Sequence, residues 1–296
     1  MFKIFPKKND STEGIAQNIS HMGRVISVLN QKGGVGKTTM AFNLARALKE
    51  SGKKVLMIDM DPQANLTLLC NVDDEKIQAT IFQALVNSIK ELKPLHRPAL
   101  LSEVIIKGEG NMPDLIASSQ DLSGFELTVA GITFPRQLIL KNFMTKSQIL
   151  DLYDAVVIDG PPTLGLLMVN ILCASQGVVV PFQADQFSEL GLENFHQVLE
   201  DIEEMGITEV PKILGYVPNM FDQRRKQSLV DLDKIKSKLA QQYNSEPHIF
   251  EPFANKVQLV KSSSQKKSVF DFATVEFKDL QKQFLNIAQH IGQELQ

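Results

Sequence analysis

The chain has 296 residues, of which 43% are hydrophobic and 22% charged, and its formal net charge is −3. This composition is that of an ordinary globular protein with a sizeable core, and the slightly acidic balance excludes DNA binding through bulk charge, so any such binding needs a local basic face. The two cysteines, Cys70 and Cys173, lack metal-ligand spacing, and we find neither a signal peptide nor an apolar run of membrane-spanning length. These features predict a cytoplasmic protein.

Residues 1–22 mix charged and polar side chains without sustained periodicity, and we expect them to form a mobile N-terminal extension. The alternative is a short docking segment, because Phe2, Ile4 and Phe5 lie beside lysines. Residues 23–296 contain no internal repeat and no linker rich in Pro, Gly or Ser, which predicts a single domain.

The apolar run Val25–Leu29 is followed by a glycine-rich turn and by a helical stretch from Lys37 to about Glu50. Strand, glycine turn and helix in this order are typical of a phosphate-binding loop. Backbone N–H groups and the helix N-terminus would hold a triphosphate, Lys37 would reach its β and γ oxygens, and Thr38 would bind Mg²⁺. The candidate nucleotide-binding residues here are Lys32, Gly33, Gly34, Val35, Gly36, Lys37, Thr38 and Thr39.

The loop contains a second lysine, Lys32, five residues before Lys37. One phosphate chain has no clear use for both ammonium groups of one loop, whereas Lys32 could reach a nucleotide held by a partner subunit. In these residues the chain resembles the deviant Walker A family, which includes the ParA and Soj partition ATPases, MinD and the nitrogenase iron protein. The resemblance implies ATP and Mg²⁺ as cofactors, with Lys32 and Lys37 as catalytic lysines and Thr38 as a metal ligand.

Two further motifs follow in order. Val55–Ile58 is a strand-like run that ends at Asp59 and leads into Asp61-Pro62-Gln63, and the apolar run Ala155–Ile158 ends at Asp159. Carboxylates at the carboxyl ends of parallel strands lie where open α/β sheets bind ligands. By resemblance to the second ParA motif, Asp59 supports the Mg²⁺ shell and Asp61 orients the attacking water.

Asp159 matches the Walker B carboxylate, which would hold Mg²⁺ through water. Gly160-Pro161-Pro162 behind it is a stiff loop suited to sensing the γ-phosphate. The family usually has Cys or Ala at the position of Gly160, a difference that touches no phosphate contact. The order of elements predicts a three-layer α/β/α P-loop NTPase, with a mostly parallel, twisted sheet and helices on both faces.

Apolar periodicity and breakers predict the remaining elements. Helices are expected over 80–92, 137–152, 188–205, 229–243 and 275–295, and strands over 114–117, 177–181 and 213–217.

Asn219 follows the last predicted strand, and its amide can pair with an adenine base, as residues there do in related proteins; the alternative is an asparagine that caps the strand. The most basic part of the chain comes next. Basic side chains can neutralise phosphates and bind DNA without sequence preference, and the equivalent region of ParA proteins contributes their non-specific DNA surface. The alternative is that these side chains form only a solvated face. The candidate DNA-binding residues are Arg224, Arg225, Lys226, Lys256 and Lys261.

The resemblance implies a homodimer with ATP sandwiched between its subunits, bound to non-specific DNA and stimulated by a ParB-like centromere-binding protein. Such a switch segregates plasmid or chromosome DNA and lies on the nucleoid when ATP is bound. One alternative is the same ATPase positioning a protein cargo, such as a chemosensory array or polar or division machinery. A MinD-like membrane-cycling regulator is disfavoured because the final helix lacks a cationic amphipathic face, so we expect no stable membrane association. An iron–sulfur carrier would need paired cysteines at the dimer axis, and Cys70 and Cys173 do not occupy the positions just after the family motifs that would supply them.

Overall fold

The computed structural model describes residues 23–185, 188–222, 224–242, 247–254 and 257–295. The predictions for residues 1–22 and for Lys256 therefore lie outside the described residues. The strands are β1 (Arg24–Val28), β2 (Val55–Asp59), β3 (Ile105–Ile106), β4 (Asp114–Ile116), β5 (Ala155–Asp159), β6 (Gly177–Gln183) and β7 (Lys212–Asn219). The α-helices are α2 (Lys37–Glu50), α3 (Asn65–Leu69), α4 (Ile81–Ser88), α5 (Leu101–Val104), α6 (Phe125–Thr128), α7 (Ile139–Lys146), α8 (Ile149–Leu152), α9 (Leu166–Ala174), α10 (Ser188–Met205), α11 (Lys226–Gln242), α12 (Val257–Ser264) and α13 (Val275–Glu294).

The seven strands form one sheet in the order β3-β4-β2-β5-β1-β6-β7. All neighbouring pairs are parallel except β3 with β4. The central strands β2 and β5 are buried along their whole length, as expected for parallel strands covered on both faces. The predicted, mostly parallel sheet is confirmed.

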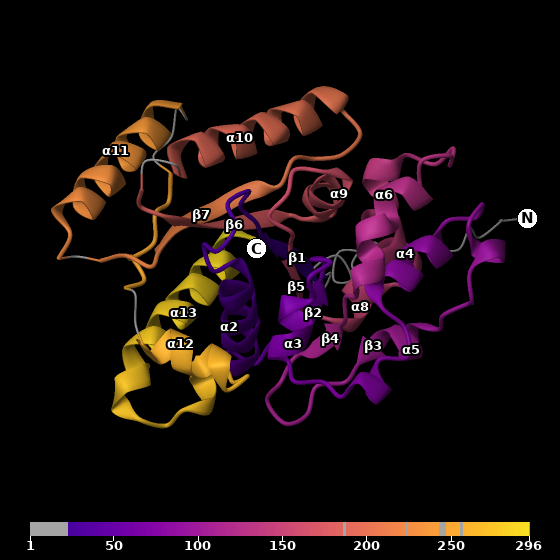
Figure 1. The fold of residues 1–296 in the computed structure, drawn as a ribbon, viewed down its shortest axis with the longest axis horizontal. Helices are drawn as coiled ribbons and strands as arrows, with labels where there is room; N and C mark the ends of the chain where they lie inside the picture. The colour runs from indigo at the N-terminus through magenta and orange to yellow at the C-terminus, as the bar shows by residue number, and fades with distance from the viewer. Residues whose placement is uncertain (1–22, 186–187, 223, 243–246, 255–256, 296) are drawn as a thin grey trace, which may run out of the picture.

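Helices cover both faces of this sheet (Figure 1). Alternate residues of a strand point to opposite faces, and on β2 Leu56 and Ile58 join one apolar core while Val55 and Met57 join another. The first core contains residues of α9, α10 and α11, and the second contains residues of α2 and α13. The predicted three-layer arrangement is therefore present.

The helix predicted over 137–152 is wrong as one continuous element. A 3-10 turn precedes α7, and the chain breaks at Gln148, whose φ of 53° is left-handed. The Ser147 hydroxyl donates to the Phe143 carbonyl at 2.7 Å, which competes with the helical hydrogen bonds. After the break α8 returns Ile149 to the core, where it is fully buried.

The helix predicted over 80–92 also ends early, because Ile89 adopts an extended conformation after Ser88. Within the described part of the chain, every helix is too short or too polar to cross a bilayer.

Candidate nucleotide-binding site

The loop between β1 and α2 has the backbone that a phosphate-binding loop requires. Gly34 and Gly36 have φ values of 76° and 89°, in the left-handed region that favours glycine. A Cβ atom at Gly36 would lie 2.3 Å from Nδ2 of Asn219, so only glycine fits there. Gly36 is the N-cap of α2, whose first turn carries no acidic residue. The N-terminal N–H groups of α2 and its positive dipole end are therefore available to an anion.

Hydrogen bonds to distant parts of the chain hold this loop in shape. Asn30 donates through Nδ2 to the Pro181 carbonyl at 2.7 Å, and its Oδ1 accepts the backbone N–H of Lys32 at 2.9 Å. The ammonium of Lys37 donates to the Lys32 carbonyl at 3.1 Å. These hydrogen bonds therefore come from the protein's own groups and define the shape of the loop.

The side chains of the two loop lysines lie in different surroundings. Lys37 is 7% exposed and lines a cavity of about 590 Å³. Lys32 is not among the described residues that line this cavity, and its ammonium pairs with the carboxylate of Asp185.

The cavity brings together most of the residues predicted for the phosphate site. Its lining residues are Gly33, Gly34, Gly36, Lys37, Thr38, Thr39, Asp61, Gln63, Asn65, Leu68, Leu69, Pro162, Met220, Ser263, Ser264 and Lys266. The last four come from segments after β7 that have no recognisable phosphate motif. Met220 directly follows Asn219 at the end of β7, whereas Ser263, Ser264 and Lys266 reach the cavity only through the packing of α12, which the sequence does not reveal.

Hydrogen bonds between α2 and the segment after α12 explain why α12 lies there. Oδ1 of Asn43, on α2, accepts both the Ser268 hydroxyl and the Val269 backbone N–H at 2.9 Å. Arg46, one turn further along α2, pairs with Asp271 at 3.1 Å.

Asp59 and Asp159 are register partners at the carboxyl ends of β2 and β5 and are both fully buried. The Asp59 carboxylate is occupied by its own chain. Its Oδ2 accepts the backbone N–H and the hydroxyl of Thr67, each at 2.8 Å, and its Oδ1 accepts the Asp61 N–H at 3.1 Å. Within the described part of the chain, neither oxygen of Asp159 accepts a hydrogen bond, although the Thr38 hydroxyl is near enough to favour its charged form.

Burial dominates the electrostatics of this site. Desolvation raises the pKa of Asp159 well above its ordinary value, and the neighbouring Asp59 adds to the effect. Burial also raises the pKa of Asp59, against the hydrogen bonds from Thr67. The pKa of Lys37 is lowered by burial, and the carboxylates of Asp159 and Asp61 oppose that shift. Buried carboxylates held beside a lysine need a further cation or protons to balance them.

An Mg²⁺ ion bound with a nucleotide fits this donor set. Among the described residues, no group of three or more His, Cys, Asp or Glu side chains is arranged to hold a metal. Mg²⁺ commonly takes one or two protein oxygens and completes its octahedron with phosphates and water. The Thr38 hydroxyl and the Asp159 carboxylate are oxygens of the kind that could take this part, whereas the oxygens of Asp59 already accept hydrogen bonds from Asp61 and Thr67.

Asp61 is 6% exposed and lines the cavity, and its Oδ1 accepts the Gln63 N–H at 2.9 Å. This places a carboxylate at the cavity wall, within the region predicted to hold the terminal phosphate.

Asn219 does not project freely. Its Nδ2 donates to the Val35 carbonyl at 2.8 Å, which ties the end of β7 to the loop. It also lines a second cavity of about 450 Å³, beside the first. That cavity is bordered by apolar residues of α12, including Leu259 and Val260.

The residues predicted to bind DNA differ in their surroundings. Arg224 and Arg225 precede α11, are 92% and 78% exposed, and both approach Asp222. Lys226 is the exposed first residue of α11. Lys261, on α12, pairs with Glu276 at 3.2 Å and lies over the ring of Phe277.

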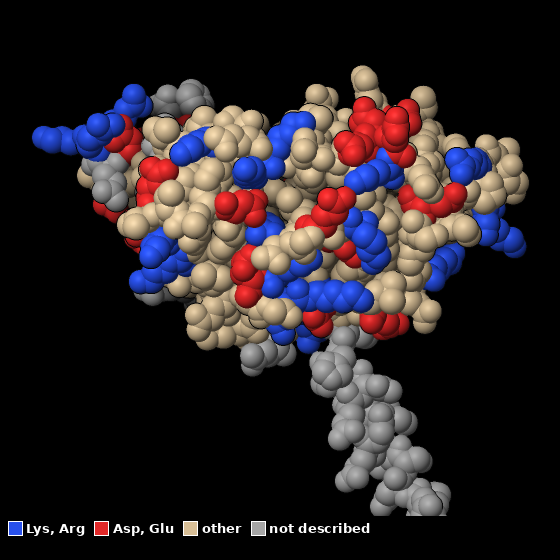
Figure 2. Space-filling view, turned by 90° about the horizontal axis from the view of Figure 1, so that it is seen from below, with Lys and Arg blue, Asp and Glu red and all other residues tan. Residues whose placement is uncertain are grey.

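Acidic and basic side chains are interspersed across the face seen in Figure 2. A group of basic side chains protrudes at its left edge, on the side that α11 occupies in Figure 1. Such a surface offers DNA local contacts and no broad positive field.

Comparison with known proteins identifies the family. Residues 23–210 match the family model described as an AAA domain. The chromosome partitioning protein ParA of Myxococcus xanthus is 33% identical over 203 residues, which cover 69% of this chain and 67% of that protein. This chain belongs to the ParA/Soj family of P-loop partition ATPases.

Two further proteins are similar to this ParA/Soj-family chain, one in sequence and one in structure. The sporulation initiation inhibitor protein Soj of Bacillus subtilis is 31% identical, over 73% of this chain and 79% of its own length. The structure of an ATP complex of Cyanothece McdA superposes with a TM-score of 0.76 at 23% identity, and covers 92% of this chain and 97% of that one. The likeness to McdA supports the fold.

Proposed function

We propose that this ParA-family chain is an Mg²⁺-dependent ATPase that forms a dimer around ATP, binds DNA without sequence preference and segregates plasmid or chromosome DNA with a ParB-like partner. The observation that carries the proposal is the separation of the two loop lysines. Lys37 lines the phosphate cavity of its own subunit, whereas the ammonium of Lys32 is directed to Asp185. A lysine placed in this way is available to a nucleotide held by a second copy.

The residues around the two cavities account for ATP binding. The loop N–H groups and Lys37 hold the phosphates, and Thr38 and Asp159 hold the metal. Bound Mg²⁺ would neutralise charge that develops on the phosphate oxygens. The second cavity lies beside Gly36 and Thr39 and has apolar walls suited to a base and ribose. Asn219 lines this second cavity, where its carbonyl oxygen could accept from the adenine amino group.

Hydrolysis needs an oriented water and stabilisation of the transferring phosphoryl group. Asp61 orients the water from the cavity wall, and Lys32 of a second subunit adds positive charge beside that of Lys37. An aspartate is a weak base for this task, so turnover is slow without the partner protein.

The exposed Arg224, Arg225 and Lys226 supply the first DNA contacts. Three basic residues in one subunit bind DNA weakly. A dimer carries two such sets, and once the first set is bound the second is held close to the same DNA, which raises the apparent affinity. DNA retention then follows the nucleotide state, and the cytoplasmic protein accumulates on the nucleoid with ATP. We propose DNA as the cargo because the Myxococcus xanthus relative is a named chromosome partitioning protein.

The test is retention on non-specific DNA with ATP, with ADP and without nucleotide. Wild type should be retained with ATP alone, Lys37→Ala under no condition, and Arg225→Glu weakly with ATP. Lys90→Glu, an exposed residue just beyond α4, changes the charge by the same amount and should behave as wild type. DNA binding that ignores the nucleotide contradicts the switch. If Arg225→Glu is retained on DNA as well as wild type, the DNA-binding surface lies elsewhere and the ATPase proposal is unaffected.

A Lys32→Gln variant tests the dimer directly by sedimentation with Mg²⁺ and a non-hydrolysable ATP analogue. Loss of dimer formation with unchanged ADP binding supports a lysine that acts across the interface. Nucleotide-driven dimers and turnover equal to wild type would show that Lys32 does not act across the interface, and the observation that carries the proposal would be lost.

A further inference from the structure

The ion pair between Lys32 and Asp185 joins two parts of the chain 153 residues apart. Asp185 lies between the end of β6 and the start of α10 and has a second role there. Its Oδ1 accepts the backbone N–H and the hydroxyl of Ser188, each at 3.0 Å, while Oδ2 faces Lys32. One carboxylate thus anchors the first residue of α10 and holds the lysine of the phosphate loop.

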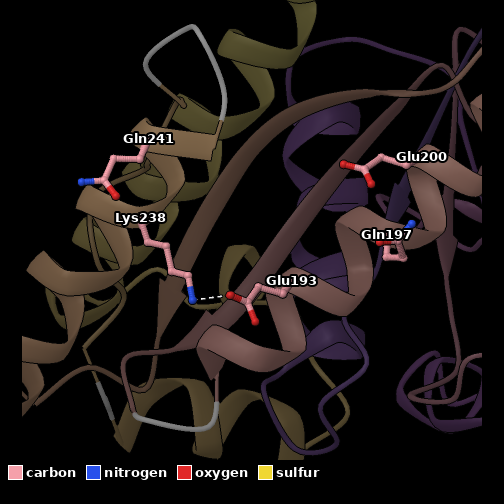
Figure 3. A pocket seen from close by; sticks show the side chains of 5 residues that line it. All are labelled: Glu193, Gln197, Glu200, Lys238 and Gln241. Carbon is pink, nitrogen blue, oxygen red and sulfur yellow. Dashed lines mark ion pairs between the residues drawn. The ribbon is translucent and has the colours of Figure 1, made fainter.

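Contacts continue from the start of α10 to α11. Glu189, the second residue of α10, accepts hydrogen bonds from Lys234 at 2.7 Å and from Lys238, both on α11. Lys238 also pairs with Glu193, one turn along α10, where it spans the gap between the two helices (Figure 3). The helix attached in this way begins at Lys226, directly after Arg224 and Arg225.

We propose that Asp185 is a positioning residue that keeps Lys32 in its own subunit until a second copy presents a phosphate. When Lys32 exchanges Asp185 for that phosphate, the anchoring of α10 changes, and Glu189 transmits the change to α11. This inference rests on the proposed function, because it requires a nucleotide held by a second copy. It adds to that function a counter-ion for the resting lysine and a physical link to the basic residues that precede α11.

The ion pair between Lys32 and Asp185 is weak enough to break and form reversibly. The Lys32 and Asp185 side chains are 26% and 36% exposed, so solvent weakens their attraction. A triphosphate carries more negative charge than a carboxylate and can displace it. The backbone of Lys32 stays tied to Asn30, so only the side chain must move.

Asp185→Asn separates the two roles of this residue. The amide oxygen can still accept from Ser188, but the negative charge facing Lys32 is lost. The dimer dissociation constant, measured with Mg²⁺ and a non-hydrolysable ATP analogue, should fall by about two- to fivefold per released pair. Asp201→Asn is the matched control, because this exposed α10 residue accepts a hydrogen bond from Gln197 of the same helix. A structural defect would weaken the dimer, so tighter association identifies the positioning role.

Two measurements exclude a general charge effect. ADP affinity of the Asp185→Asn monomer should stay within about twofold of wild type, and Asp201→Asn, which removes the same charge from α10, should leave the dimer dissociation constant unchanged. The inference is overturned if Asp185→Asn raises ADP affinity as much as it tightens the dimer, or if it leaves the dimer dissociation constant unchanged. In both cases the proposed function stands. If wild type itself forms no dimer with the analogue, both fall.

Hydrogen exchange tests the link to α11. Wild type should show altered exchange across α11 on addition of the analogue. Glu189→Gln should reduce that response while the dimer constant stays within about twofold. A response of equal size in the variant, or none in wild type, overturns the link.

Discussion

The side-chain amide of Asn219 donates to the backbone carbonyl of Val35 at 2.8 Å, across 184 positions of sequence. This bond joins the last strand of the sheet to the phosphate-binding loop. It also leaves no room for a Cβ at Gly36, since that atom would lie 2.3 Å from Asn219 Nδ2. The loop's glycine and the asparagine of β7 are therefore a matched pair.

Gly36→Ala should lower the free energy of unfolding more than Gly34→Ala does. Both positions have positive φ, which costs an alanine about 1–2 kcal/mol. A Cβ at Gly34 meets nothing within 4 Å, whereas at Gly36 it displaces Asn219. Urea unfolding should show the larger loss for Gly36→Ala, with nucleotide binding reduced as well. Adding Asn219→Ala should recover part of the stability lost in Gly36→Ala; equal losses for the two single variants would contradict the clash.

Gly160→Ala should destabilise the protein by about 1–3 kcal/mol, although family members carry Ala or Cys there. The new Cβ would lie 2.2 Å from Cδ2 of Leu29, which is fully buried, and 3.0 Å from Cδ1 of Ile171. Leu29→Val alone should cost about 1 kcal/mol and should reduce the cost of Gly160→Ala in the double variant. Additive losses in this double-mutant cycle would show that Leu29 is not the obstacle.

Asp159→Asn should stabilise the nucleotide-free protein at pH 7.5 while abolishing hydrolysis. The folded-state pKa of Asp159 is raised by burial, so its favourable contribution exists at low pH and is lost as pH rises through that pKa. A tenfold change in an acid dissociation constant corresponds to about 1.4 kcal/mol. Urea unfolding at pH 7.5 should favour the variant by about 1 kcal/mol or more, and the advantage should shrink at pH 5. The exposed Asp279, on α13, provides an Asp→Asn control for the loss of one carboxylate, and an Asp159→Asn advantage that grows toward pH 5 would reverse the sign of the argument.

Asp222→Asn should raise the affinity of the ATP-bound protein for non-specific DNA. Asp222 accepts from Arg224 at 3.2 Å and lies 3.9 Å from Arg225, so its charge partly neutralises both. Fluorescence anisotropy at about 100 mM salt should show a gain of about two- to fivefold, because solvent screens exposed charge pairs and keeps their effect small. Asp121→Asn, near α6, should leave binding unchanged. Weaker binding after Asp222→Asn would mean that the carboxylate positions the arginines for DNA.

The sequence by itself determined the six parallel strands and the loop after the first of them, but not the short antiparallel strand β3 or the order of the strands in the sheet. Each motif consists of a buried strand and the few residues behind it, so Lys37, Asp59 and Asp159 are placed by local chain direction and by the common edge of parallel strands. The break at Gln148 was not predictable, because an apolar periodicity that continues through a single left-handed residue looks like one helix.

Only the tertiary structure decided which of these groups are free. Thr67 donates to Oδ2 of Asp59 and the Asp61 N–H donates to Oδ1, whereas within the described residues the Asp159 oxygens accept no such hydrogen bonds, although both aspartates end similar strands. Lys32 meets Asp185, and α12 closes the cavity, through contacts between segments far apart in the chain. Such contacts depend on how helices pack over the sheet, and no pattern of neighbouring residues encodes which distant side chain a given oxygen or ammonium will meet.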